Sequence, residues 1–153
     1  FRLSTQLNEK ILNMEYNTLK RLITIGVKNI IFIRFDNVTG PELSYFIQLT
    51  RFVKKSVEMP QILARITISS EISYFTEIEG GDKIVITKYE FSEEERTLHN
   101  FIIGEIMESD DVEKVKRFLN NLASALRGQR EFNRERLQEI LEVESRRFIK
   151  EIF

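Results

Sequence analysis

The sequence predicts an α/β domain with a mainly parallel sheet, helices packed on that sheet, and an α-helical extension at the C-terminal end. Short apolar segments alternate with longer segments of helical periodicity, which is typical of strand–helix–strand units. The segment at 29–35 is almost continuously apolar and rich in β-branched and aromatic residues, as expected for a strand covered on both faces. We divide the chain into an α/β domain at 1–108 and a helical hairpin at 109–153.

The composition is that of a globular protein. Hydrophobic residues make up 42% of the 153 residues, charged residues 31%, and the formal net charge is −1. No overall field therefore attracts nucleic acid or an acidic membrane. The absence of cysteine excludes disulfides and thiolate metal sites. No apolar run approaches the roughly 18 residues of a membrane span, and no signal peptide is visible. We expect a cytoplasmic location, no membrane span and no nucleic-acid partner.

The N-terminal segment is predicted to form a strand and then a helix. The chain starts at Phe1 inside the predicted strand at 1–4, so we expect further residues upstream. The helix extends from Asn8 to about Ile25 with an apolar stripe, and Gly26 fits the position just past its end.

The apolar strand at 29–35 is followed by a turn and a predicted helix. Thr39-Gly-Pro-Glu has the spacing of a capping box, with Pro41 in the first helical turn. This predicts a helix over 41–57. Loops that follow the strands of an open α/β sheet are where ligands and partners usually bind, so we place the candidate site at this turn.

The middle of the chain has two possible interpretations. We predict a strand at 62–68, a short helix at 69–78 and a strand at 83–87. The alternative is a β-hairpin over 74–87 that turns on Gly80-Gly81-Asp82. We favour the helix because Ser70 can cap it and the glycines can end it.

Three helices are predicted for the remainder. Ser92 and Glu95 form a second capping box, which predicts a helix that reaches Ile106. Ser109-Asp-Asp caps the next helix, whose apolar residues follow helical spacing until Gly128. The last helix, at 129–152, carries seven large apolar residues: Phe132, Leu137, Ile140, Leu141, Phe148, Ile149 and Ile152.

The apolar stripe of the last helix has to be buried. Each large apolar side chain left in water costs about 1.5–3 kcal/mol, so the total of about 10–20 kcal/mol exceeds the stability of a typical domain. The stripe packs either on its own chain or on another. We therefore weigh a homodimer or partner docking through the C-terminal helices equally with packing inside one chain.

In its order of elements and its spacing, the chain resembles the STAS domain of sulfate transporters and anti-sigma-factor antagonists. The resemblance rests on Arg2-Leu-Ser-Thr-Gln-Leu-Asn, on the strand and turn at 28–38, and on the segment at 63–98. It covers roughly residues 1–105. It implies a regulatory domain that acts through protein contacts, with a kinase or an anti-sigma-type regulator as the partner.

The chain departs from this family at its diagnostic motif. The family has Asp-Ser-Ser-Gly or Asp-Ser-Thr-Gly before a Leu, whereas Thr39-Gly-Pro-Glu precedes Leu43 here. No hydroxyl therefore stands at the position that a kinase phosphorylates in the family. Thr39 is the neighbouring hydroxyl, and we expect it to cap the helix rather than to accept phosphate.

We predict a non-enzymatic regulatory or scaffold protein that acts by protein–protein interaction. The predicted partner-binding residues are Thr39, Gly40, Glu42, Tyr45, Ser70 and Glu71. One alternative is a domain that senses a small ligand or nucleotide through backbone donors at the same turn. A second alternative is a self-associating structural subunit.

Catalytic and cofactor chemistry have little support. His99 is the only histidine and has no cysteine nearby, so we expect neither a catalytic base nor a metal ligand there. Gly80-Gly81-Asp82 lacks the lysine and the spacing of a phosphate-binding loop. We predict no catalytic residues, no metal and no cofactor.

Overall fold

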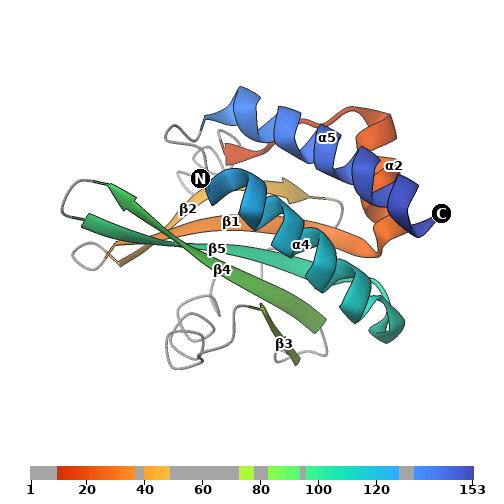
Figure 1. Ribbon diagram of the computed structural model, residues 1–153, viewed down its shortest axis with the longest axis horizontal. Helices are drawn as coiled ribbons and strands as arrows, with labels where there is room; N and C mark the ends of the chain where they lie inside the picture. Colours follow the sequence, from red (N-terminus) through yellow and green to blue (C-terminus); the bar gives the residue numbers. More distant parts are fainter. Residues whose placement is uncertain (1–9, 37–39, 49–72, 78–82, 94–95, 128–132) are drawn as a thin grey trace, which may run out of the picture.

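The structure is a computed structural model that describes residues 10–36, 40–48, 73–77, 83–93, 96–127 and 133–153. These residues form a five-stranded sheet and α-helices that share a core with one of its faces (Figure 1). The strands are β1 (Val27–Asp36), β2 (Gly40–Gln48), β3 (Ser73–Glu77), β4 (Lys83–Glu93) and β5 (Arg96–Ile106). The helices are α2 (Tyr16–Ile25), α4 (Val112–Arg127) and α5 (Arg134–Ile152), with the short 3-10 helix η1 (Ser109–Asp111) before α4.

Every pairing between neighbouring strands is antiparallel, in the order β2-β1-β5-β4-β3. The predicted mainly parallel sheet is therefore wrong. Only residues 37–39 separate β1 from β2, and only residues 94–95 separate β4 from β5, whereas a parallel connection needs about a dozen residues or more. The parallel neighbours that the STAS resemblance implied for the strand at 29–35 are absent, because both neighbours of β1 are antiparallel.

The helix predicted over 41–57 is wrong over the described part of that range, where the chain forms strand β2. Pro41 suggested a first helical turn, but proline is also tolerated on an edge strand. On the outer side of such a strand there is no neighbouring strand to which a backbone N–H would donate. β2 stands at the end of the strand order. Its side chains follow the period of two that a strand requires: Tyr45 and Ile47 pack in the helix-side core, and Phe46 is buried outside it.

The helix predicted from Ser92 to Ile106 is also wrong, because β4 continues to Glu93 and β5 follows. Gly104 explains part of the difference. A Cβ at this position would lie 3.0 Å from Cδ1 of Leu119 and 3.5 Å from Cγ1 of Val115, so the glycine allows α4 to approach the sheet. Glycine is unfavourable inside a helix, but in a strand it often marks such a close approach.

The hairpin alternative is correct for the middle of the chain. β3 pairs with the first part of β4, with Ser73 opposite Thr87 and Glu77 opposite Lys83. The short helix predicted at 69–78 is therefore wrong over Ser73–Glu77. The Ser73 hydroxyl donates to Oδ1 of Asn120 in α4 at 2.7 Å, so β3 is tied to the helix layer as well as to β4. The predicted strands at 1–4 and 62–68 lie outside the described residues.

Helix α2 ends where the sequence predicted. Gly26 follows it with a φ of 109°, and its N–H donates to the carbonyl oxygens of Leu22 and Ile23. The helix begins at Tyr16, later than predicted, because the chain before it is bonded to the sheet edge. The N–H of Leu12 donates to the carbonyl oxygen of Phe46 at 2.8 Å.

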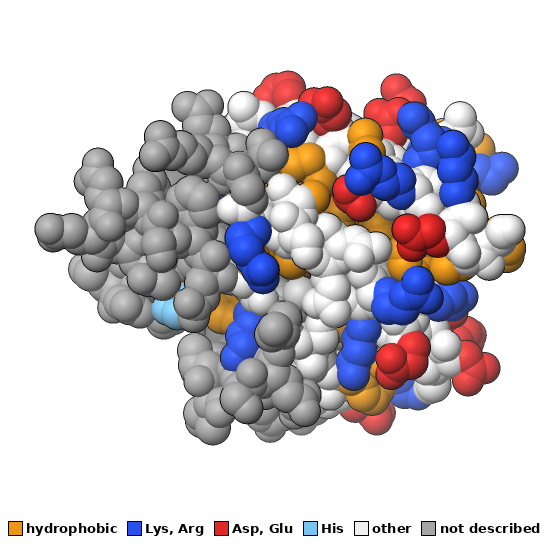
Figure 2. Space-filling model, viewed as in Figure 1, with side chains coloured by type: hydrophobic (Ala, Val, Ile, Leu, Met, Phe, Trp, Pro, Cys, Tyr) orange, Lys and Arg blue, Asp and Glu red, His pale blue; other side chains and the backbone are white. Residues whose placement is uncertain are grey.

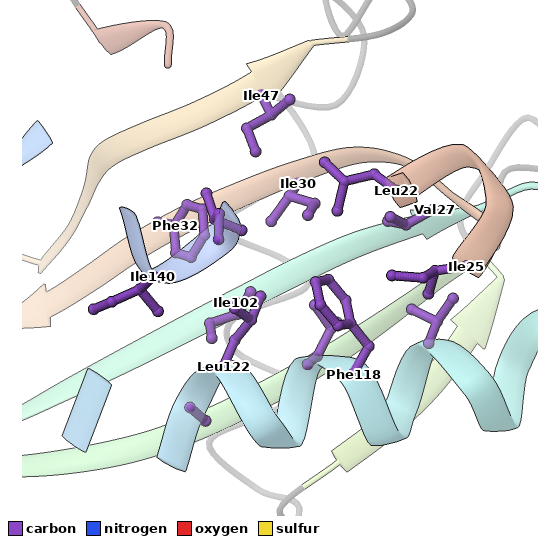
Figure 3. Close-up of a cluster of buried hydrophobic side chains, with 14 of the residues drawn as sticks. Leu22, Ile25, Val27, Ile30, Phe32, Ile47, Ile102, Phe118, Leu122 and Ile140 are labelled. Carbon is purple, nitrogen blue, oxygen red and sulfur yellow. The ribbon is translucent and has the colours of Figure 1, made fainter. Parts of the chain in front are cut away.

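Helix α4 agrees with the prediction, and α5 agrees with it from Arg134 onward, after an extended Asn133 that caps it. Both helices bury their apolar stripes inside this chain. The rings of Phe118 in α4 and Phe148 in α5 lie with their centres 5.6 Å apart. Figure 3 shows where the helix layer meets the sheet, with labelled side chains from α2, the strands and both C-terminal helices: Leu22, Ile25, Val27, Ile30, Phe32, Ile47, Ile102, Phe118, Leu122 and Ile140. The stripes that could have required a second chain therefore have partners within their own.

The opposite face of the sheet is apolar and buried too. Its buried hydrophobic residues, which lie outside the helix-side core, are Ile31, Ile33, Phe46, Ile84, Ile86, Phe101 and Ile103. Burial on both faces explains the nearly continuous apolar run at 29–35. Such runs are typical of parallel sheets because those sheets are usually covered on both sides. The pattern indicates burial of both faces and does not indicate whether neighbouring strands are parallel or antiparallel.

Candidate functional site

Three polar side chains form a row across three adjacent strands, toward the end of the sheet where β1 finishes. In the strand register, Arg34 of β1 lies opposite Asn100 of β5, and Asn100 lies opposite Tyr89 of β4. Tyr89 belongs to the helix-side core, so the row is on the face that carries the helices. The Cβ atoms of directly opposed residues are about 5 Å apart. We call Arg34, Asn100 and Tyr89 the polar row.

The polar row has unused hydrogen-bonding capacity. Among the described residues, Arg34 carries the buried side-chain nitrogen for which no hydrogen-bond acceptor is present. The Nε atom of Arg34 is buried and has no hydrogen bond. A buried N–H group without an acceptor is costly, and more so when it carries charge.

The Tyr89 hydroxyl is a donor at neutral pH. Its side chain is only 6% exposed, and this burial raises the pKa of the phenol well above its ordinary value. The positive charge of Arg34 acts in the opposite direction but more weakly. The polar row therefore combines a guanidinium, an amide and a neutral hydroxyl, with one positive charge in total.

A second guanidinium lies at the same end of the sheet. Cζ of Arg134, the first residue of α5, is 5.8 Å from the centre of the Tyr45 ring. Tyr45 lies opposite Phe32, two residues before Arg34 in β1. The N-terminal end of α5 is thus directed toward this end of the sheet (Figure 1), and a helix N-terminus carries a partial positive charge. Two positive groups therefore lie at this end of the sheet, and the register also places Glu42 opposite Arg34.

The outward side of α2 carries a different feature. Tyr16 is 71% exposed and Ile23 is 47% exposed, and their spacing of seven residues puts them on one side of the helix. Nζ of Lys20, between them, is 5.2 Å from the centre of the Tyr16 ring. Met107 is 40% exposed and lies beside the end of α2, because its N–H donates to the Gly26 carbonyl at 2.8 Å. We call Tyr16, Lys20, Ile23 and Met107 the α2 surface.

The outer sides of α4 and α5 are instead covered by charges of both signs (Figure 2). Nη2 of Arg146 is 2.6 Å from Oε1 of Glu142, and Nη1 of Arg136 is 3.1 Å from Oε2 of Glu139. These pairs follow helical spacing and are exposed, so each contributes little to stability. Such a surface has no basic patch suited to nucleic acid.

No known family model and no curated protein matches the chain. Its function therefore has to be inferred from its own side chains. No group of three or more potential metal ligands occurs among the described residues, and none of the described helices is long and apolar enough to cross a membrane. His99 lies in strand β5 and not in a helix.

Three of the six predicted partner-binding residues lie outside the described residues, and the other three lie in a strand instead of at a helix start. Thr39, Ser70 and Glu71 lie outside the described residues. Because the segment from Gly40 is a strand, there is no helix start there for Thr39 to cap.

The other three predicted residues, Gly40, Glu42 and Tyr45, lie in β2. Tyr45 is half-buried and contacts Arg134. Ser73, two residues after Glu71, begins β3, and β2 and β3 stand at opposite ends of the strand order, so Tyr45 lies apart from β3. Partner binding by the predicted residues stays a prediction.

The polar row was missed in the sequence, although one signal was present. Arg34 is the only charged residue in the apolar run at 29–35, and a charge in a doubly covered strand needs a specific partner. Asn100 was assigned to a helix, and Tyr89 was placed just beyond a strand. The order of the strands is what brings the three together, and that order was predicted wrongly.

Proposed function

We propose that the protein acts by binding another protein, as a non-catalytic scaffold or regulatory subunit in cellular signalling. The observation that carries this proposal is the α2 surface. A cytoplasmic location belongs to the same proposal.

The α2 surface exposes apolar area that the fold does not use. The inner side of α2 is already buried through Leu22 and Ile25, and Tyr16 and Ile23 are not among the core residues. Tyrosine and methionine are enriched in the central parts of protein interfaces, and clustered exposed apolar side chains are typical of interaction sites. The arrangement suits a docking surface centred on Ile23.

The charge of α2 indicates the kind of partner. The helix contains Lys20 and Arg21 and no acidic residue. Complementary potentials favour encounter and orientation of two surfaces. We therefore expect a partner with an apolar centre and acidic groups at its rim.

The test is affinity capture from cells followed by binding measurements with the purified captured protein. The variant Ile23→Glu places a like charge against the acidic rim and removes apolar contact, so we expect its affinity to fall at least tenfold. Val143→Glu is the matched control, because Val143 on α5 is also exposed and is not part of the α2 surface. Equal affinities of Ile23→Glu and wild type would overturn the proposal.

Self-association is a separate outcome of the same design. Sedimentation equilibrium of the wild type and of Ile23→Glu shows whether the partner is a second copy, which requires a dimer that the variant loses. A dimer that persists in Ile23→Glu would contradict a docking role for the α2 surface. Homodimerisation through α4 and α5 is not part of the proposal, because their apolar stripes are buried within the chain.

A further inference from the structure

We propose that the edge of β2 that faces α5 binds an extended segment of another protein, one that carries a leucine-sized side chain. In the structure the chain's own residues 11–13 occupy this position (Figure 1). We call these residues the resident segment, and we call the position between Phe46 of β2 and Arg134 and Gln138 of α5 the edge site. The proposed docking surface is the outward side of α2, so the two proposals stand or fall separately.

The resident segment extends the sheet by a short parallel addition. The N–H of Leu12 donates to the carbonyl oxygen of Phe46 in β2 at 2.8 Å, and Ile11 pairs with Phe46 in the parallel direction. β2 stands at the end of the strand order, and addition of an extended segment to a sheet edge is a recurring mode of peptide recognition. The bond to β2 is made by backbone atoms, which every peptide has.

Helix α5 binds the other side of the resident segment. Nη1 of Arg134 donates to the carbonyl oxygen of Ile11 at 2.6 Å, and Nε2 of Gln138 donates to the carbonyl oxygen of Asn13 at 2.9 Å. Alternate carbonyl groups of an extended chain point to the same side and repeat about every 6.6 Å. Residues four apart in a helix are separated by about 6 Å along its axis. The two donors of α5 are therefore spaced to match an extended backbone of any sequence.

One side chain of the resident segment sets the specificity. Leu12 is only 2% exposed and belongs to the helix-side core, whereas Ile11 is half-buried and Asn13 is exposed. In strand addition, backbone hydrogen bonds give affinity and pockets for alternate side chains give specificity. A ligand for the edge site therefore needs one leucine-sized apolar residue and can be polar at the residue that follows it.

The short connection to α2 favours a segment of another protein over a second copy of this chain. Only Met14 and Glu15 separate the resident segment from Tyr16, the first residue of α2. The resident segment of a second copy could reach the edge site only if its α2 moved with it, and the inner side of α2 is part of the helix-side core. A segment of another protein has no such constraint.

The resident segment competes with a ligand because it is tethered. A segment on a short linker has an effective concentration in about the millimolar range, so a free peptide binds the wild type weakly. Glu15, the N-cap residue of α2, makes no side-chain hydrogen bond to the helix, so withdrawal of the resident segment breaks no side-chain cap of α2. The resident segment is therefore an internal inhibitor of the edge site.

The experiment uses a fluorescein-labelled peptide with the sequence of residues 8–16, titrated with the full chain and followed by fluorescence anisotropy. We expect the Leu12→Ala chain to bind this peptide at least about tenfold more tightly than the wild type does, because its resident segment is held less firmly. The peptide with Leu12→Asp should bind neither protein. Equal affinities of the Leu12→Ala chain and the wild type would overturn the proposal.

Further substitutions in the Leu12→Ala chain assign the binding to α5. Gln138→Ala removes a donor to the peptide backbone and should weaken binding about threefold or more. Glu139→Ala changes the next residue of α5, which is exposed, and should leave the affinity unchanged. Equal effects of the two substitutions would contradict an edge site bounded by Gln138.

A second measurement needs no substitution. In ¹H–¹⁵N NMR of the wild type, excess unlabelled peptide should displace the resident segment, so the amide signal of Leu12 should shift while that of buried Ile103 in β5 stays in place. A Leu12 amide that does not shift would overturn the proposal. A wild-type dimer in sedimentation that the peptide dissociates would assign the edge site to a second copy and overturn the choice of another protein.

Discussion

The side chain of Asn29 in β1 donates a hydrogen bond to Oε2 of Glu105 in β5, with an Nδ2–Oε2 distance of 2.6 Å. The two side chains are 0% and 4% exposed, and the residues lie directly opposite each other in the register. They are on the sheet face away from the helices, among isoleucine and phenylalanine side chains. This pair therefore joins the two central strands by a charged hydrogen bond in an apolar setting.

Replacement of Asn29 by Leu should destabilise the protein. The change removes a donor from the buried Glu105 side chain, and loss of a hydrogen bond to a charged group costs about 1.5–3 kcal/mol. Urea unfolding measures the change in the free energy of unfolding. The same substitution at Asn121, which is exposed on α4, is the control and should change stability by less than about 0.5 kcal/mol. An equal effect of both variants would show that the pair contributes nothing specific.

Gly26→Ala should destabilise the protein through two separate causes. The φ of 109° is unfavourable for alanine by about 1–2 kcal/mol, and the new Cβ would lie 2.6 Å from Cβ of Asp111. In the double variant with Asp111→Gly, which lacks that Cβ, only the second cause is relieved. A double-mutant cycle by chemical denaturation should therefore show coupling between the two positions but incomplete recovery. Full recovery of stability in the double variant would mean that alanine adopts the positive φ at position 26 without a measurable loss of stability.

Phe148→Ala should be among the most destabilising single changes in the helix layer. Phe148 is fully buried and its ring packs against Phe118, and Phe-to-Ala changes in cores cost about 3–5 kcal/mol. The aromatic contact itself should account for about 0.5–1.5 kcal/mol, measured by a cycle with Phe118→Leu. If Phe148→Ala lowers the free energy of unfolding by much less than this amount, α5 is not part of the cooperative core.

Arg34→Met should stabilise the protein. The substitution removes a buried N–H group without an acceptor and keeps a long apolar stem. We expect a gain of about 1 kcal/mol in the free energy of unfolding. Thermal and urea unfolding measure it. A loss of stability would indicate that Arg34 has a structural role.

Tyr89 should make stability depend on pH in the alkaline range. Burial raises the pKa of its phenol in the folded state above the ordinary value of 10.0, so the folded protein holds this proton more tightly than the unfolded chain does. Its contribution is complete below about pH 10 and is lost as the pH rises further, by at most about 1.4 kcal/mol per pH unit. Tyr89→Phe lacks this dependence, so the difference between the two unfolding curves above pH 10 isolates it. Parallel curves would contradict the effect of burial.

Local signals for helix ends held only in part: Pro41, expected in a first helical turn, lies in β2, and Ser92, expected to begin a helix, lies in β4. Gly26 marked the end of α2. A helical segment does begin at Ser109, but its cap is Glu108, and Ser109-Asp-Asp is the 3-10 helix itself. The apolar stripe of α5 was also recognisable from its period. What the stripe packs against could not be read from it, since burial in the chain and burial in a dimer require the same residues.

The errors arose where a local pattern has two physical meanings. Thr39-Gly-Pro-Glu suits a helix start, but Pro41 is equally acceptable on an edge strand. The run at 29–35 suits a parallel strand, but any strand with two buried faces shows it. Because the predicted sheet order was wrong, the polar row could not be found, although Arg34 stood out in its strand.

Because β1 pairs with β5, a strand far along the chain, β1 cannot complete its pairing early in synthesis. During synthesis the β1–β2 hairpin leaves the ribosome well before β5, so the inner side of β1 has free backbone donors and acceptors until Ile106 has emerged. Such an unpaired apolar edge is prone to pairing with other chains. A message truncated before β5 should therefore yield aggregated product rather than a smaller folded domain.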